Sequence, residues 1–318
     1  MLCSACWDTS RTRTFNDEGA RFVSLTGTHR KRRRKYIGAS DVPAIIGVSP
    51  WKTASDVYYD KTAAFEDTKD TVNKAIQAGV LLEDSVIDFA AQSLDVKVKR
   101  NQFRVHKEYK WASSTLDALI VGGDQYAYHR NEAIEAKTTS MPDGWGEERT
   151  DQIPIYYIAQ VQWQMFVTGI ERVWVPCLMP DYVLAFKLYV VDRDEDIISR
   201  LVEQCGDFWK DNVLAGVPPA HTVPAPRTIQ RMKRMPDKVV VVDDKLVAKY
   251  QAAATAQREA AKVLKEAKMK MLESLGDAEV GSYDGGILRY HKSVRKAYTK
   301  EVPEATYRSL KIKEDPSE

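Results

Sequence analysis

Apolar residues recur at steps of three and four over residues 71–94, and this spacing places them on one face of a helix. The segment therefore predicts one long amphipathic helix whose apolar stripe packs on the rest of the protein. One member of the stripe is an acid, Glu83, at a position where an apolar side chain is expected. The stripe consists of Val72, Ile76, Val80, Glu83, Ile87, Ala90 and Leu94.

Strand-like segments stand between this helix and two later ones. Residues 114–123 form an apolar run that ends in a glycine turn, and residues 132–139 follow as its expected hairpin partner. The order helix, three strands, helix, two strands, helix predicts an α/β fold with a mixed sheet flanked by helices. The further predicted strands cover residues 101–106, 172–179 and 182–192, and the further helices cover residues 41–46 with Ser40 as N-cap, 153–169 with Pro154 in the first turn and Gly169 at the end, and 196–216.

Proline and charge patterns divide the chain further. Four prolines fall within residues 217–228, which favours a linker. After it, a segment rich in Ala, Lys and Glu predicts a long helix over residues 238–275 that pairs as a coiled coil, and residues 281–294 predict a β-hairpin. The expected organisation is a poorly ordered segment 1–30, a main domain 31–218, a Pro-rich linker 219–236, and a C-terminal extension 237–318 made of the long helix and the hairpin.

The composition is that of an ordinary globular protein, since 44% of the 318 residues are hydrophobic and 29% are charged. No apolar run reaches the length of a membrane span, and the first residues lack the apolar core of a signal peptide, so we expect a cytoplasmic protein with no membrane partner. The net charge is only +2, but residues 29–35, HRKRRRK, hold six Lys or Arg in seven positions. This run is either a solvated arm or a contact to phosphates.

Three acids and a lysine form the candidate chemical site. Strand alternation places Glu135 and Lys137 on one face of residues 132–139, with Ala136 on the other. If the hairpin pairs as expected, Asp117 comes close to Glu135, and two neighbouring carboxylates repel each other unless a proton or a cation lies between them. Mg²⁺ is a hard cation that binds carboxylate oxygens and keeps several waters, one of which can attack a phosphodiester. Lys137 would orient or deprotonate that water, or neutralise charge on the phosphate.

A simpler interpretation of these residues also exists. Glu-x-Lys is a common strand pattern that usually forms a salt-bridged surface, and Glu83 could be an exposed residue at the edge of its helix. However, Asp117 lies inside the apolar run STLDALIV and Glu83 inside an apolar stripe, and burying an unpaired carboxylate costs several kcal/mol. Two inward-facing acids therefore favour a shared cation.

Five segments resemble a known family in their order along the chain: GASDVPAIIGVSPWKT, LLED, STLDALIV, IEAKTT and YYIAQVQWQM. This order is similar to that of the YqaJ-like viral recombinases, relatives of phage lambda exonuclease, over roughly residues 33–215. The resemblance implies a restriction-endonuclease-like PD-(D/E)xK core, a mixed sheet between helices. It also implies digestion of double-stranded DNA from 5′ ends with Mg²⁺ in the bacterial host cytoplasm, leaving a 3′ single strand that passes to a single-strand annealing protein.

The resemblance assigns roles to individual residues. It implies that Asp117 and Glu135 bind the metal, that Ala136 offers its backbone carbonyl to it, that Lys137 is the catalytic lysine, and that Glu83 supplies a further acid to the metal site. The expected cofactor is Mg²⁺, as two ions, with Mn²⁺ as a substitute, and a homotrimer around DNA is expected from lambda exonuclease. The other implied residues are Gln160, which supports the site, and Arg33, Arg34, Ser40 and Ser114, which hold the 5′-phosphate.

Two other functions stay open at this point. A structure-specific endonuclease would use the same core, and a DNA-binding protein could keep the fold without turnover. One aromatic residue also has two interpretations. Trp51 follows the Ser-Pro break, and its side chain either packs in the core under the first helix, which we favour, or stacks on a frayed base.

Overall fold

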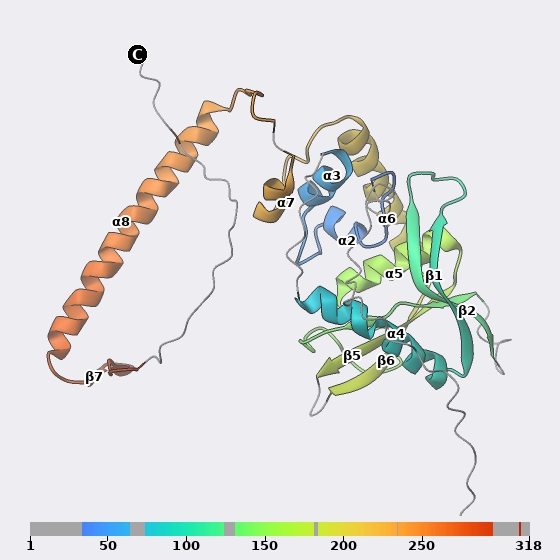
Figure 1. The fold of residues 1–318 in the computed structure, drawn as a ribbon, viewed down its shortest axis with the longest axis horizontal. Helices are drawn as coiled ribbons and strands as arrows, with labels where there is room; N and C mark the ends of the chain where they lie inside the picture. Colours follow the sequence, from blue (N-terminus) through green and yellow to red (C-terminus); the bar gives the residue numbers. More distant parts are fainter. Residues whose placement is uncertain are drawn as a thin grey trace, which may run out of the picture. The chain divides into compact units, whose positions relative to one another are not determined.

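The computed structural model of this protein describes residues 34–63, 74–123, 131–180, 184–233, 235–294 and 312. The chain divides into two compact units, Met1–Lys233 and Arg234–Glu318 (Figure 1). The predicted segment 1–30 lies outside the described residues. Within the residues that are described, no helix combines the length and the apolarity that crossing a bilayer requires.

A mixed sheet forms the centre of the first unit. Its strands are β1 Val96–Val105, β2 Ser113–Gly123, β3 Glu132–Ile134, β4 Lys137–Thr138, β5 Arg172–Pro180 and β6 Leu184–Asp192. β2 pairs antiparallel with β1 and β3, and β5 with β6, whereas β3 and β4 run parallel to β5. Ile134 pairs with Trp174 and Lys137 with Cys177 in one register, so β3 and β4 follow each other along the same edge of β5. The predicted pairing of residues 114–123 with 132–139 is confirmed for β2 and β3, whereas Lys137 and Thr138 pair with β5.

Helices cover both faces of this sheet, as predicted. They are α2 Val42–Ile45, α3 Ala54–Thr62, α4 Lys74–Ser93, α5 Ile155–Thr168, α6 Glu195–Asp207, a π-helix over Phe208–Leu214, and α7 Pro226–Arg231. Ala133 lies in the apolar cluster with α5, and its neighbour Ile134 lies in the cluster with α4. Likewise, Val173 lies in the cluster with α5 and Trp174 lies in the cluster with α4. Since neighbouring strand residues point to opposite faces, α4 and α5 pack on opposite sides of the sheet.

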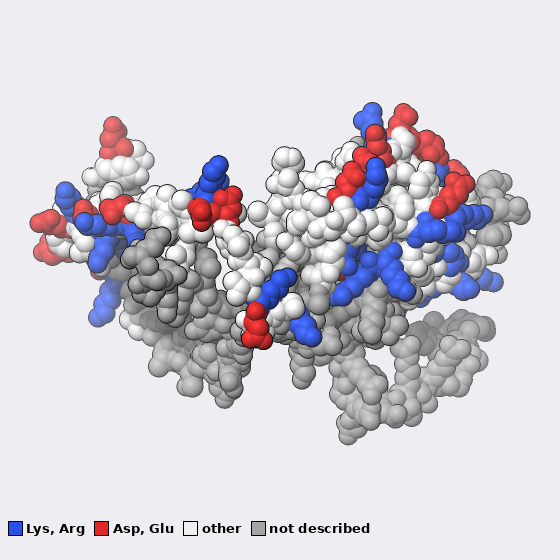
Figure 2. Space-filling model, turned by 90° about the horizontal axis from the view of Figure 1, so that it is seen from above, with Lys and Arg blue, Asp and Glu red and all other residues white. Residues whose placement is uncertain are grey.

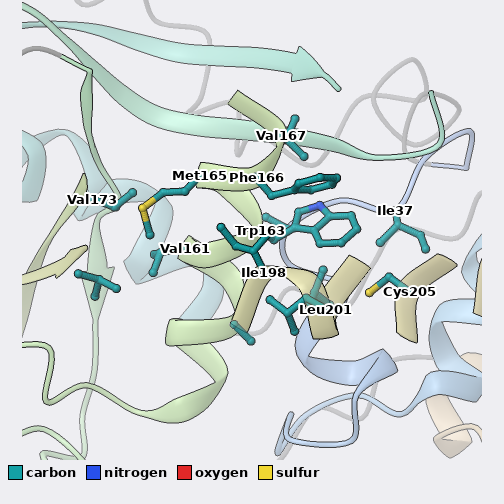
Figure 3. Packing of buried hydrophobic residues seen from close by; sticks show 14 of the residues in the cluster. Ile37, Val161, Trp163, Met165, Phe166, Val167, Val173, Ile198, Leu201 and Cys205 are labelled. Carbon is teal, nitrogen blue, oxygen red and sulfur yellow. The ribbon is translucent and has the colours of Figure 1, made fainter. Parts of the chain in front are cut away.

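Trp163 of α5 lies at the centre of the larger core (Figure 3). Its side chain is fully buried, and its Nε1 donates a hydrogen bond to the carbonyl oxygen of Ser113 at 3.2 Å, so its polar atom is satisfied. Ile37, from the segment before α2, belongs to the same cluster, as do Leu201 and Cys205 of α6. This core therefore connects α5 to α6 and to the segment before α2.

The start of α2 differs from the prediction. The N-cap is Asp41 and not Ser40, and the Asp41 side chain makes no capping hydrogen bond. It is used elsewhere: its Oδ2 lies 2.5 Å from Nζ of Lys61 in a buried ion pair and accepts a hydrogen bond from N of Gly38 at 3.1 Å. The sequence pattern Ser-Asp correctly predicted that a helix starts here. It did not show that Asp41 would be the N-cap or that its side chain would bind Lys61.

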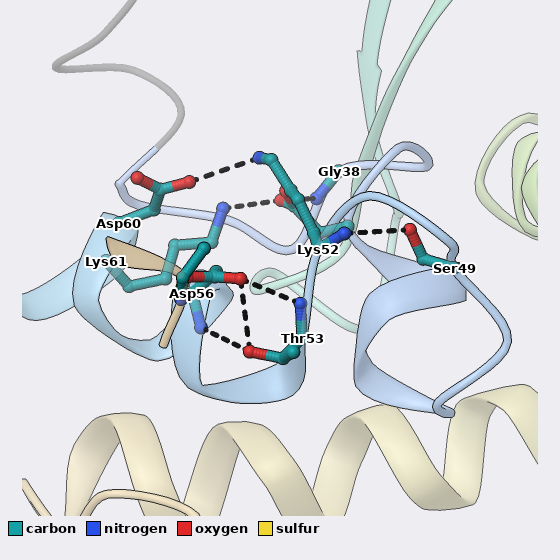
Figure 4. Close-up of polar contacts among 9 residues, drawn as sticks. Gly38, Ser49, Lys52, Thr53, Asp56, Asp60 and Lys61 are labelled. Atoms are coloured by element: carbon teal, nitrogen blue, oxygen red, sulfur yellow. Dashed lines mark hydrogen bonds and ion pairs between the residues drawn. The ribbon is translucent and has the colours of Figure 1, made fainter. Parts of the chain in front are cut away.

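Helix α3 was not predicted, although its start carries a sequence signal. Thr53 and Asp56 form a capping box, in which each side chain accepts a hydrogen bond from the backbone N–H of the other (Figure 4). Oδ1 of Asp56 also accepts a hydrogen bond from N of Ala225 at 2.7 Å. Within the predicted linker 219–236, this contact and α7 therefore give the chain an ordered attachment to α3.

The apolar stripe of α4 is buried only toward its C-terminal end. Ile87 and Ala90 lie in the core, whereas Ile76 and Val80 are 59% and 49% exposed. The prediction that the whole stripe packs on the protein is wrong for the first half of the helix. The periodicity defines which side chains share a face, but it does not show how far a covering surface extends along that face.

The described residues of the second unit form a long helix and a hairpin, as predicted. The elements are α8 Asp244–Leu275, β7 Val280–Tyr283 and β8 Gly286–Arg289. The helix begins after Asp243, later than residue 238, because the Asp243 side chain accepts a hydrogen bond from N of Lys245. Gly285 turns the hairpin with a φ of 106°, which favours glycine. The coiled-coil pairing of α8 stays a prediction.

We expect Asp56→Ala to destabilise the first unit by about 1–3 kcal/mol, because it removes the cap of α3 and leaves the N–H groups of Thr53 and Ala225 without their acceptor. Urea unfolding followed by circular dichroism measures this loss. Asp60→Ala is the matched control, since Asp60 lies on the same helix and forms a surface ion pair with Lys52 that contributes less than about 1 kcal/mol. Equal losses for the two variants would contradict the capping role.

The difference between Asp56→Ala and the unaltered protein should also depend on pH. Burial acts to raise the pKa of Asp56, but the hydrogen bonds from Thr53, Thr228 and Ala225 outweigh it and hold the pKa below its ordinary value. The stabilisation is therefore complete above the unfolded-state pKa of about 3.9 and is lost as the pH falls through the lower folded-state value.

Candidate active site

Strands β2 and β3 separate at Asp117. Their pairing includes Ala118 with Ile134, so Asp117 and Glu135 would be the next partners along the ladder. Instead, Oδ2 of Asp117 accepts a hydrogen bond from the backbone N of Ala136 at 2.9 Å. A side-chain carboxylate thus takes over the role of a strand carbonyl, and the acid is fixed where the two strands part.

Glu135 is buried, with 4% of its surface exposed, and three side-chain donors hold its carboxylate. Nζ of Lys137 lies 2.6 Å from Oε1, and Nε2 of Gln160 lies 2.5 Å from the same oxygen. Nε2 of Gln164 lies 2.6 Å from Oε2. Since each carboxylate oxygen has two lone-pair sites, these bonds fix the orientation of Glu135 and still leave room for a further ligand at Oε2.

The two glutamines lie on one face of α5, because they are four residues apart. The helix begins directly after Pro154, which is its N-cap and not part of the first turn as predicted. It ends at Gly169 as predicted, where a φ of 75° terminates it. Sequence analysis named Gln160 but missed Gln164. The spacing in AQVQWQ was an available signal, but α5 is buried on most sides, so its periodicity does not show which glutamines face the sheet.

Lys137 lies among groups that keep it protonated. Its Nζ also contacts Oε1 of Gln160 at 3.2 Å and lies 4.7 Å from the centroid of the Tyr157 ring. Burial acts to lower the pKa of Lys137, but the carboxylates of Glu135 and Asp117 outweigh burial and raise it above its ordinary value. Of the roles considered for this lysine, the charged ones therefore fit the geometry better than the abstraction of a proton.

The three acids influence one another electrostatically. Burial and then the charge of Glu135 raise the pKa of Asp117 well above its ordinary value, and Glu83 adds to this shift. The pKa of Glu83 is raised by the same two causes, burial and Glu135. Glu83 is half-buried on α4, so the fully exposed position considered for it is wrong. The fold has thus brought the acids of α4, β2 and the β3–β4 segment into one electrostatic cluster.

This donor set fits a hard divalent cation at Asp117 and Glu135. Oδ1 of Asp117 has no hydrogen-bond partner among the described residues. Burial and then the charge of Glu135 raise the pKa of both Asp117 and Glu83, so a bound cation would stabilise the ionised acids. Carboxylate oxygens are the ligands that Mg²⁺ and similar cations bind. Among the residues described, no three His, Cys, Asp or Glu side chains come close enough to hold one ion together, so Glu83 stands near the pair without completing it.

The segment before α2 lies beside the start of β2. Ser113 N donates a hydrogen bond to the carbonyl oxygen of Ile37 at 2.9 Å, and Ile37 pairs with Ala112 in a parallel bridge. Basic side chains gather in a band on the right-hand part of the face seen in Figure 2, below a group of acidic ones. Of the residues expected at a 5′-phosphate, Ser40 is exposed, Arg34 is half-buried, Ser114 is buried, and Arg33 lies outside the described residues.

This chain folds into a mixed sheet flanked by helices. Two acids and a lysine form a cluster at the point where two strands of the sheet separate. Residues 29–171 match the family model of the YqaJ-like viral recombinase domain, which confirms the resemblance found in the motifs. The chain is 33% identical over 194 residues to the protein YqaJ of Bacillus subtilis (strain 168). That match covers 59% of this chain and 56% of the relative, so the chain spans little more than half the length of this relative.

Solved structures with a similar arrangement include an alkaline exonuclease (LHK-Exo) from Laribacter hongkongensis. It is 17% identical, with a TM-score of 0.45, over 58% of this chain and 91% of that one. A phage-related exonuclease from Haemophilus somnus 129PT is 14% identical, with a TM-score of 0.43, over 59% of this chain and 98% of that one. Because both TM-scores lie below 0.5, we base the fold on the strand order and helix packing described above.

Gln164→Leu should cost about 1–3 kcal/mol of stability, because it leaves one oxygen of a buried carboxylate without its donor. In a double-mutant cycle with Glu135→Gln, positions 135 and 164 should show a coupling of about 0.5–3 kcal/mol, since the two side chains are in direct contact. The free energies of unfolding in urea of the four proteins give this coupling.

Gln162→Leu is the matched control for this cycle. Gln162 lies on the same helix and is equally buried, but it bonds to the backbone of Asp192 and Asp194. Its coupling to position 135 should lie within about 0.5 kcal/mol of zero. If both glutamines gave the same coupling, Gln164 would be an ordinary buried glutamine with no specific role at Glu135.

Proposed function

We propose that this protein is a metal-dependent DNA exonuclease that hydrolyses phosphodiester bonds from the ends of linear duplex DNA. The observation that carries the proposal is the cluster of Asp117, Glu135 and Lys137, in which a buried carboxylate and a protonated lysine are fixed beside a second acid. The match to the YqaJ-like viral recombinase domain over residues 29–171 supports it.

The residues of the site suggest a division of labour. Asp117, Glu135 and the backbone carbonyl of Ala136 would hold the divalent cation, Mg²⁺ or Mn²⁺, which supplies a water of lowered pKa and charge to polarise the phosphate. Gln160 and Gln164 keep the Glu135 carboxylate in one orientation. Glu83 of α4 adds negative charge near the pair and would accept a hydrogen bond from a bound water or hold part of a second ion.

Lys137 would act as a fixed positive charge beside the attacked phosphate. Glu135 and Asp117 raise the pKa of Lys137 above its ordinary value, so its ammonium would stabilise the negative charge that develops on the phosphate oxygens. The Tyr157 ring beneath it limits the directions in which the ammonium can move. The lysine therefore contributes position and charge.

The finer features of the proposal come from the family resemblance. They are digestion in the 5′→3′ direction, a 3′ single strand as product, transfer of that strand to a single-strand annealing protein, a homotrimeric assembly, the PD-(D/E)xK core, and work in the cytoplasm of a bacterial host. The match to a viral recombinase domain supports a role in phage recombination.

A pocket for a terminal 5′-phosphate is part of the proposal. Ser40 is exposed. The bridge between Ile37 and Ala112 holds the segment that contains Ser40 beside the start of β2, where Ser114 lies. The hydroxyl of Ser114 is buried without a hydrogen-bond partner among the described residues, an arrangement that costs about 1–3 kcal/mol. A phosphate oxygen would accept its hydrogen bond after a change of side-chain rotamer. Arg33 and Arg34 would supply positive charge to the same phosphate.

Lys137→Ala should lower the rate of digestion of an end-labelled linear duplex by at least about a hundredfold, because it removes the fixed charge beside the phosphate. Circular dichroism and the binding of fluorescent duplex in EDTA should remain close to those of the unaltered protein. Lys137→Gln keeps a donor for Glu135 and controls for loss of folding; it should be as inactive as the alanine variant. Robust digestion by either variant would rule out this role for Lys137.

Two control reactions separate the proposal from its alternatives. EDTA should stop digestion, and added Mg²⁺ or Mn²⁺ should restore it, whereas a DNA-binding protein without turnover would digest nothing at any metal concentration. Closed circular duplex should stay intact, because an exonuclease requires an end. Nicking of the circle would instead assign a structure-specific endonuclease on the same core.

Ser40→Ala should reduce the preference for a 5′-phosphorylated end over a 5′-hydroxyl end by about tenfold or more, because it removes a hydrogen bond to a charged group. The measurement is the ratio of kcat/KM for the two duplexes. Ser199→Ala, which changes an exposed serine on α6, is the control and should leave this ratio unchanged. An unaltered ratio in Ser40→Ala would exclude Ser40 from the phosphate pocket.

A further inference from the structure

Trp51 is 66% exposed, so the expected position in the core is wrong. Single exposed apolar residues are common on protein surfaces, and exposure alone does not indicate a function. Trp51 differs from such residues in two respects. Its backbone is held in one conformation, and its ring is part of an aromatic cluster that reaches the candidate active site.

The backbone around Trp51 is fixed by side chains on both sides. Oγ of Ser49 accepts hydrogen bonds from N of Trp51 at 3.3 Å and from N of Lys52 at 3.2 Å. The next residue, Thr53, is the N-cap of α3, and its capping box with Asp56 is part of the same polar network (Figure 4). The indole therefore extends from an ordered turn.

The indole ring contacts the first turn of α5. Its centroid lies 4.9 Å from the centroid of Tyr156, with the planes at 74°, and 6.3 Å from that of Tyr157. Tyr157 in turn lies 4.7 Å below Nζ of Lys137. One ring thus separates the exposed indole from the lysine proposed to stand beside the scissile phosphate.

We propose that Trp51, supported by Tyr156, is a stacking site for one nucleobase of the DNA end that is being digested. An edge-to-face contact with Tyr156 orients the indole while two-thirds of the Trp51 surface remains open to a flat ligand. Every base has a π-face, so such a site accepts any sequence, as an exonuclease requires. This inference rests on the proposed function, because the base is placed by a phosphate bound near Lys137.

The test compares linear duplexes that differ only at the terminal nucleotide, which carries either a base or an abasic site. For the unaltered protein, we expect KM to rise by about tenfold, and at most about a hundredfold, when the base is missing. For Trp51→Ala, KM on both duplexes should equal the high value that the unaltered protein shows on the abasic duplex, and kcat should fall far less. Trp51→Phe keeps a ring for stacking, so it should restore most of the difference in KM between the two duplexes.

A second readout does not depend on hydrolysis. In EDTA, binding to a duplex with 2-aminopurine as its terminal base should quench the fluorescence of that base if it stacks on an indole. Trp51→Ala should bind with clearly less quenching, and Leu214→Ala, which truncates a side chain of similar exposure, should quench as the unaltered protein does.

The outcomes distinguish this inference from the proposed function. If the unaltered protein digests no linear duplex with Mg²⁺ or Mn²⁺, the proposed function fails and the stacking site fails with it. If it does digest DNA, but Trp51→Ala matches it in both KM and quenching, only the stacking site is overturned. An equal loss on base-containing and abasic ends would also overturn it, because it would show a structural role for Trp51.

Discussion

The ion pair between Glu135 and Lys137 is the constraint on which the rest of the first unit depends. A charged pair is stable inside a protein only when its geometry is good and its remaining hydrogen-bonding sites are filled. Lys137 is almost enclosed, and Glu135 more so, hence neighbouring elements must supply these partners. α5 supplies two glutamines, and β2 turns away so that Asp117 meets the backbone of Ala136 and not that of Glu135.

Burying these charged side chains costs free energy, and packing in other parts of the unit offsets that cost. Burial, and after it the charge of Glu135, raises the pKa of Asp117 and of Glu83, so folding buries acids that also repel one another. The large core around Trp163, on the same helix as the two glutamines, supplies the apolar burial that holds α5 in place. The site is thus positioned in advance, and the proposed cation and phosphate would meet groups that are already oriented.

The sequence predicted the parts of the site that follow from local geometry. The face shared by Glu135 and Lys137 follows from strand alternation, the approach of Asp117 from the hairpin, and the limits of α5 from Pro154 and Gly169. The remaining features depend on packing between distant segments. Gln164 faces Glu135 only because of the rotation of α5 on the sheet, which a nearly all-apolar helix does not reveal.

Sequence patterns also did not predict which apolar side chains are exposed. Trp51 and the apolar residues Ile76 and Val80 have the character of core residues, and the structure leaves all three at the surface. Hydrophobic character shows that a side chain favours burial, but the surface that would cover it is defined by the whole fold. The capping role expected for Ser40 is wrong because α2 begins at Val42 with Asp41 as its N-cap, and the Asp41 side chain forms a buried ion pair with Lys61 of α3.

The division into two units has an optical consequence. All seven tryptophans precede residue 234, so the unit formed by α8 and its hairpin contains none. Intrinsic tryptophan fluorescence therefore follows only the unit with the candidate active site, while α8 contributes strongly to the far-ultraviolet circular dichroism. Melting curves from the two signals would coincide only if both units unfold together, and a difference between them would give the stability of each unit from one unlabelled chain.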